Sequence, residues 1–248
     1  MTEWIRNWML WSTVLIGAAP VRAQHVSERV SQGNSAVQAA RYDEALQAFQ
    51  EALAGVEPGS PEAGDLQLRI GETYRRKGDL TAAVASLSRA RELLPGSPVV
   101  TGTLALALDL TGKFPEAEAA YRATLELDPD NAIAMNNLAY LLAMHGGPLE
   151  EALGLAGQAH RMAADSADFS DTLAVVKMRM GDFATARAIL MDLVRREPGD
   201  EGFRRHLAAV LEQEPWRKRA DQELLDALRG VGVSENTQRV ADIVSRMK

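Results

Sequence analysis

The sequence predicts an all-α solenoid of about six helix–turn–helix repeats, closed by a C-terminal capping helix. Three observations support this fold class: a period of about 34 residues, apolar residues at helical spacing within each period, and turn residues between the helices. A single helical hairpin of this length cannot bury its apolar face alone, so several copies have to stack on one another. The prediction is therefore a repeat array rather than one globular core.

The clearest copy of the repeat occupies residues 70–95 and reads as two short amphipathic helices. Gly71 lies on the inner face of the first helix, and Ala83 and Leu87 share one face of the second. Gly78 marks the turn between the two helices. Because glycine and alanine are small, the two backbones can approach closely while the leucine fills the space beside them.

One small residue recurs at the same place in the second helix of each repeat. It stands at Ala45, Ala83, Ala117, Ala152, Ala186 and Ala220. The intervals between these alanines are 38, 34, 35, 34 and 34 residues. The position four residues later is occupied by Phe49, Leu87, Tyr121, Ala156, Leu190 and Leu224. Closing prolines at Pro95, Pro129 and Pro198 keep the same phase.

This pattern resembles the tetratricopeptide repeat family, whose helix–turn–helix unit has about 34 residues. The resemblance implies a solenoid over residues 24–229 in which six repeats follow one another. Their approximate ranges are 25–59, 64–96, 97–130, 131–165, 166–200 and 201–229. The sixth repeat departs from the pattern, because Pro215-Trp216 replaces its glycine turn. We expect residues 230–248 to form the capping helix, since terminal repeats have to cover the exposed end of the core.

Residues 1–23 predict a secretory signal peptide. Arg6 precedes an apolar run from Trp8 to Ala19, and small residues end the segment at Ala23. The run is shorter than the roughly 20 residues that span a bilayer. We therefore expect cleavage after Ala23 and a periplasmic or secreted product without a stable membrane anchor. An uncleaved anchor, or an apolar N-terminal helix that follows a wrongly assigned start, remains an alternative.

Composition and motifs disfavour several function classes. The net charge is −7 and no basic run is present, which disfavours nucleic acid as a partner. The sequence contains no cysteine, so neither disulfides nor the acylated cysteine of a lipoprotein is expected. It also contains no glycine-rich phosphate loop and no GxSxG elbow. We therefore predict that the protein is not an enzyme and uses no cofactor.

Titratable residues give no clear metal site. The four histidines make no ligand-spaced pair, and they stand at His25, His145, His160 and His206. A solvated or capping role is the favoured interpretation for each of them. Three aspartates cluster where the fifth repeat begins, at Asp165, Asp168 and Asp171. We interpret them as helix-start residues that cap N–H groups and favour the helix dipole, and we predict no metal.

The resemblance implies a binding surface, because the first helices of tetratricopeptide repeats line a concave groove. Carried over by phase, the groove candidates are Asn34, Arg69, Glu72, Arg76, Asn136, Asn137, Tyr140, Asp171 and Arg205. Asn137 occupies a place where family members often grip an extended peptide backbone. An amide suits that role because it offers a donor and an acceptor without a charge to desolvate.

Three of these candidates keep alternative interpretations. Arg69 and Arg76 either bind an acidic or C-terminal carboxylate of a partner, or form a solvated ion pair with Glu72. Tyr140 either contacts a ligand or packs between repeats.

The predicted function is a non-catalytic protein–protein interaction scaffold, exported to the bacterial periplasm for envelope or export-machinery assembly. Its partner is expected to be a protein or peptide segment bound in the groove. The alternative is a periplasmic chaperone-like holder of extended peptides. An enzyme with a metal or substrate bound in the groove is the contrasting class.

Overall fold

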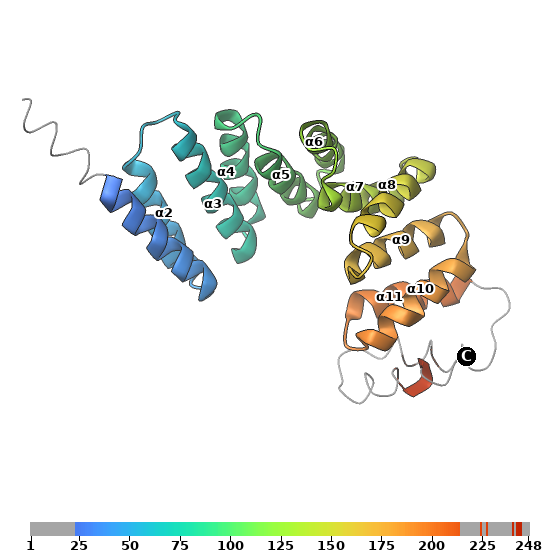
Figure 1. Ribbon diagram of the computed structural model, residues 1–248. Helices are drawn as coiled ribbons and strands as arrows, with labels where there is room; N and C mark the ends of the chain where they lie inside the picture. Colours follow the sequence, from blue (N-terminus) through green and yellow to red (C-terminus); the bar gives the residue numbers. More distant parts are fainter. Residues whose placement is uncertain (1–22, 214–223, 225–226, 228–239, 241, 245–248) are drawn as a thin grey trace, which may run out of the picture. The chain divides into compact units, whose positions relative to one another are not determined.

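The computed structural model describes residues 23–213, 224, 227, 240 and 242–244, and these residues contain helices and no strand (Figure 1). The predicted signal peptide, apart from residue 23, lies outside the described residues. The same holds for most of the second helix of the sixth repeat and of the capping helix at 230–248. No helix within the described part is both long and apolar enough to cross a bilayer.

The chain divides into two compact units, Met1–Leu127 and Asp128–Lys248. Unit 1 begins with helical residues 23–38 and continues with α2 (Tyr42–Ala54), α3 (Pro61–Lys77), α4 (Leu80–Leu93), α5 (Pro98–Leu110) and α6 (Phe114–Leu127). Unit 2 contains α7 (Ala132–Met144), α8 (Leu149–Met162), α9 (Ala167–Arg179), α10 (Phe183–Arg196) and α11 (Glu201–Gln213). Within each unit, every one of these helices packs against the next one along the chain.

Short polar residues cap the N-terminal ends of several helices. In unit 1, Ser60, Asp79 and Ser97 each accept a hydrogen bond from the N–H group three residues later. These side chains satisfy one of the free N–H groups that every helix start exposes. The turn between α3 and α4 needs Gly78, whose φ is 91°, a left-handed conformation that suits glycine.

The recurring alanines lie at the helix contacts. The five that fall within the described residues are each 0% exposed: Ala45, Ala83, Ala117, Ala152 and Ala186. The larger residues four positions later are buried beside them, with Phe49 1%, Leu87 0% and Tyr121 1% exposed. Gly71 shows how close the packing is, because a Cβ atom there would lie 2.6 Å from Cγ of Leu87. The predicted all-α solenoid of stacked helix pairs is confirmed.

Candidate functional site

The predicted groove residues fall into two sets, one in each unit, and each set lies on first helices of the hairpins. The unit-1 face comprises Asn34, Arg69, Glu72 and Arg76, on the 23–38 helix and on α3. The unit-2 face comprises Asn136, Asn137, Tyr140, Asp171, Arg205 and the neighbouring His206, on α7, α9 and α11. Each face is described by its own contacts.

On the unit-1 face, Arg69 joins the first helix of one repeat to that of the next. Its Nη1 donates a hydrogen bond to Oδ1 of Asn34 at 3.0 Å. Arg69 is exposed and forms no ion pair among the described residues. Its guanidinium therefore keeps free donors for an acceptor on a partner.

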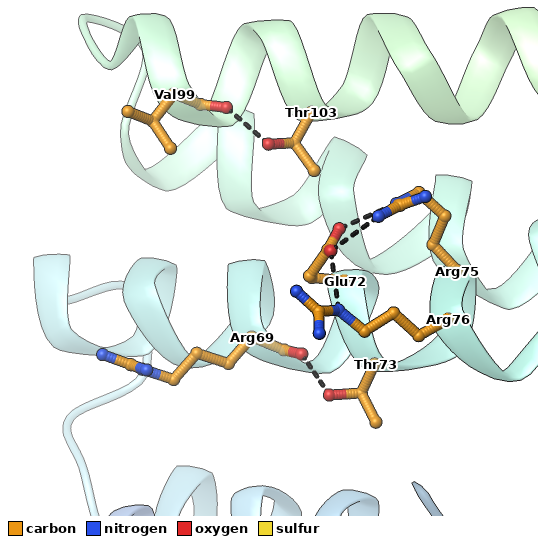
Figure 2. Close-up of polar contacts among 7 residues, drawn as sticks. All are labelled: Arg69, Glu72, Thr73, Arg75, Arg76, Val99 and Thr103. Carbon is orange, nitrogen blue, oxygen red and sulfur yellow. Dashed lines mark hydrogen bonds and ion pairs between the residues drawn. The ribbon is translucent and has the colours of Figure 1, made fainter. Parts of the chain in front are cut away.

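Glu72 is held by two arginines one turn further along α3, as Figure 2 shows. Arg75 donates from Nε to Oε2 at 2.8 Å and from Nη2 to Oε1 at 2.7 Å. Arg76 adds a bond from Nε to Oε1 at 3.0 Å. For Arg76 the structure thus shows the ion pair with Glu72, which was one of the two alternatives. Arg75 was missed, although its i,i+3 spacing from Glu72 is a known signal for such a pair.

These contacts shift the pKa values of both partners. Burial raises the pKa of Glu72, but the hydrogen bonds and charges of Arg75 and Arg76 outweigh it, so this pKa lies below its ordinary value. The hydrogen bond to Glu72 in turn raises the pKa of Arg75, against the opposing effect of burial. Glu72 is therefore an ionised structural residue, and its acceptor oxygens are already occupied.

Changing Glu72 to glutamine tests this pairing through the pH dependence of stability. Because folding lowers the pKa of Glu72, its ionisation stabilises the fold above about pH 4.5. That contribution is lost as the pH falls through the lowered pKa. We expect thermal unfolding to show a smaller fall in Tm between pH 7 and acid pH for Glu72→Gln than for the wild type.

The matched control is Glu57→Gln, at an exposed carboxylate between α2 and α3 that forms no ion pair among the described residues. Its fall in Tm should equal that of the wild type. Identical acid profiles for Glu72→Gln and the wild type would contradict the assigned role of the pair.

The next first helix of unit 1, α5, exposes an apolar side chain beside the unit-1 face. Val99, on α5, is 63% exposed, and the Thr103 hydroxyl donates to its carbonyl oxygen at 2.7 Å (Figure 2). In the same way the Thr73 hydroxyl donates to the carbonyl oxygen of Arg69 at 2.7 Å (Figure 2). Both threonines thus bind their own helices, so the polar chemistry of this face comes from the arginines and Asn34.

On the unit-2 face, two neighbouring asparagines hydrogen-bond to each other. Nδ2 of Asn136 donates to Oδ1 of Asn137 at 3.3 Å. Asn136 is only 7% exposed, and its Oδ1 is buried without a hydrogen-bond partner. A buried acceptor without a partner costs about 1–3 kcal/mol, and because this oxygen has almost no exposed surface, the accessible part of the pair belongs to Asn137. Asn137 is half-buried and keeps its own N–H donors.

A second cluster connects the three first helices of unit 2. Nδ1 of His206, on α11, lies 2.8 and 2.9 Å from the two carboxylate oxygens of Asp171, on α9. The two side chains are only 16% and 13% exposed. The Tyr140 ring, on α7, lies with its centroid 6.3 Å from that of His206, at an interplanar angle of 47°. Tyr140 therefore makes a contact between repeats.

Two expectations about this cluster were wrong. His206 is paired and largely buried, so it is neither solvated nor a helix cap. Asp171 does not cap α9, because Ser166 does so by accepting from the Phe169 N–H at 3.3 Å. Arg205 is exposed and does not join Asp171. The reason is geometric, since consecutive residues on a helix point about 100° apart and only one of them can face α9.

Among the described residues, no three histidine, aspartate or glutamate side chains gather closely enough to hold a metal ion. His160 was expected to be solvated or capping, but its Nδ1 lies 3.3 Å from Oγ of Ser170. The chemistry available on the two faces is therefore hydrogen bonding, aromatic contact and charge pairing.

Comparison with known proteins gives matches over much of the chain. The tetratricopeptide repeat pattern matches residues 30–98 and 103–168, together more than half of the sequence. The cellulose synthase operon protein C of Xanthomonas axonopodis pv. citri (strain 306) is 33% identical over 159 residues. That match covers 59% of this chain but only 10% of the Xanthomonas protein.

Solved structures share the fold at lower identity. A tetratricopeptide repeat protein from Parabacteroides merdae ATCC 43184 is 16% identical, with a TM-score of 0.65 over 90% of this chain and 99% of that one. YrrB, described as a repeat protein with an unusual peptide-binding site, is 17% identical with a TM-score of 0.57. That match covers 71% of this chain and 88% of YrrB.

Proposed function

The chain belongs to the tetratricopeptide repeat family, whose members bind protein or peptide partners, and on that premise we propose that it is a non-catalytic scaffold whose unit-2 face binds a partner segment. The observation that carries this proposal is the pair Asn136 and Asn137 beside Tyr140. The partly exposed amide of Asn137, hydrogen-bonded by Asn136, lies there one helical turn before Tyr140 on α7.

This arrangement suits an extended peptide. Each peptide unit presents one N–H donor and one C=O acceptor. The partly exposed amide of Asn137 is complementary to both groups, because its Nδ2 can donate to the C=O and the second lone pair of its Oδ1 can accept from the N–H. The Asp171–His206 pair holds α9 and α11 together beside this site. A preformed site of this kind loses little conformational entropy when a ligand binds.

We also propose where the scaffold works. The predicted signal peptide supports export to the periplasm. The similarity to a cellulose synthase operon protein supports a role in assembling envelope or export machinery. The chain spans about a tenth of that relative, so this role is proposed from similarity to one part of the Xanthomonas protein.

A photoreactive side chain at Asn137 tests the proposal in cells. We expect one or a few envelope proteins to be crosslinked, because a specific partner segment has to lie against this position. A matched probe at Gln158, exposed on the second helix α8, should not capture them. Capture of many unrelated extracytoplasmic proteins would instead favour a chaperone-like holder. No capture above the Gln158 control would contradict the proposed site.

With the partner in hand, Asn137→Ala should weaken its affinity roughly 3- to 10-fold, the value of one or two neutral hydrogen bonds. Calorimetry or fluorescence anisotropy would measure this change. An unchanged affinity would show that the partner touches the face without hydrogen-bonding to Asn137.

A further inference from the structure

Unit 2 contains a pocket that the predicted groove residues do not line. Its volume is about 600 Å³, within the range that accommodates a small ligand or a large side chain. It lies where the ends of α7, α9 and α11 meet the starts of α8 and α10. Its lining includes Ala143, Leu149, Met178, Phe183, Ala209 and Arg179.

The pocket lining is mainly apolar. Leu149, Met178 and Phe183 are half-buried, so their side chains are still partly open to a ligand. The methionine in the lining is Met178; Met180, which is 38% exposed, follows the lining residues in the sequence but lies outside the lining. Methionine side chains are flexible and polarisable, which suits contact with a large apolar group.

The charged side chain that lines this pocket is a cation. Arg179 is exposed, forms no ion pair among the described residues, and is the only charged side chain in the pocket lining. Asp182 adjoins the lining in sequence but is already engaged. Its Oδ2 lies 3.3 Å from Nζ of Lys177, and its Oδ1 accepts from the Thr185 N–H.

The start of α8 adds N–H donors to the pocket but no net preference for an anion. Pro148 occupies its N-cap and provides no side-chain hydrogen bond, unlike Asp182, which caps α10. The N–H groups at the start of α8 therefore keep donors, but Glu150 and Glu151 in its first turn offset the positive end of the helix dipole. Leu149, the first residue of α8, lines the pocket.

From these features we infer that the pocket anchors a partner segment in which a large apolar side chain stands next to an acidic one. The apolar side chain fills the pocket, and its burial drives binding. The neighbouring carboxylate pairs with Arg179 at the rim, where a bidentate contact with the guanidinium is possible. This inference rests on the proposed function and gives the scaffold a second contact for its partner.

Peptide selection tests the inference directly. A phage library of random 12-residue peptides is selected against the full chain, and the enriched sequences are read. We expect at least tenfold enrichment of peptides with Phe, Leu or Trp beside Asp or Glu. Ala209→Phe, which fills the pocket, should abolish that enrichment, and Arg179→Glu should shift it toward apolar residues beside Lys or Arg.

The controls separate binding from folding. Arg161→Glu, at an exposed arginine near the end of α8, should leave the selection unchanged. Arg179 is exposed, so its variant remains informative if Ala209→Phe does not fold. No enrichment on the wild type, or the same peptides enriched on all variants, would overturn the inference.

A photoreactive side chain at Met180 tests whether something other than a partner segment occupies the pocket. A crosslink to another part of the same chain, or to a second copy, would overturn the assignment to a partner. If the Asn137 probe captures a partner whose binding the Arg179 and Ala209 variants do not change, the pocket inference alone fails. If the Asn137 probe captures nothing, the proposed site itself fails, whatever the pocket selects.

Discussion

Changing Phe49 to alanine should lower the free energy of unfolding of unit 1 by about 3–5 kcal/mol. Phe49 is 1% exposed and is one of the largest fully buried side chains among the described residues. Its ring packs against Gly33, where a Cβ atom would lie 2.4 Å from Cε1 of the ring. Removal of the ring would leave a cavity that the rigid contact with the 23–38 helix cannot close. Urea unfolding followed by circular dichroism would measure the loss.

The control for this change lies on the next residue of α2. Gln50 is exposed, so Gln50→Ala should change the free energy of unfolding by less than about 0.5 kcal/mol. A loss below about 1 kcal/mol for Phe49→Ala would mean that the aromatic ring does not fill the core of the first repeat.

Changing Ala117 to phenylalanine should destabilise the third repeat by about 1–3 kcal/mol. Ala117, on α6, is 0% exposed and belongs to the recurring set of alanines at which helices meet. A phenyl group there has to push α5 and α6 apart or adopt a strained rotamer, because these two helices pack together. The change is read as a lower Tm and a lower urea midpoint.

Ala119→Phe is the matched control, since Ala119 lies on the same helix and is exposed. It adds the same side chain without entering the contact between helices, so the stability should stay within about 0.5 kcal/mol of the wild type. Equal stability of Ala117→Phe and Ala119→Phe would show that the repeat phase is misplaced in this part of the chain.

The fold was predictable because its signal is local and repeated. Ala83 and Leu87 mark one contact between two helices, and the same contact recurs at a fixed distance along the chain. A pattern that satisfies helical spacing, small contact residues and turn glycines in every copy leaves few other folds. The structure places these residues at the buried positions that the period requires.

The candidate site was less predictable, because it depends on which residue of a helix faces a neighbour. Arg205 and His206 are adjacent, and the phase of the repeat selected the former whereas the structure pairs the latter with Asp171. Adjacent residues on a helix point about 100° apart, so the phase of a repeat does not by itself identify the residue that pairs with the next repeat. The pocket beside Arg179 was not predicted, because it is built from the ends of several helices that no single repeat contains.

Within each unit, the packing of each helix against the next one along the chain has a consequence for how the protein reaches its folded state. Contacts between neighbouring hairpins close only short loops, so little entropy is lost before they stabilise the structure. Folding rates rise as the contacts of a protein become more local in sequence. A chain that arrives one end first, from a ribosome or through a membrane pore, can therefore complete its packing hairpin by hairpin. It does not have to wait for residues far downstream.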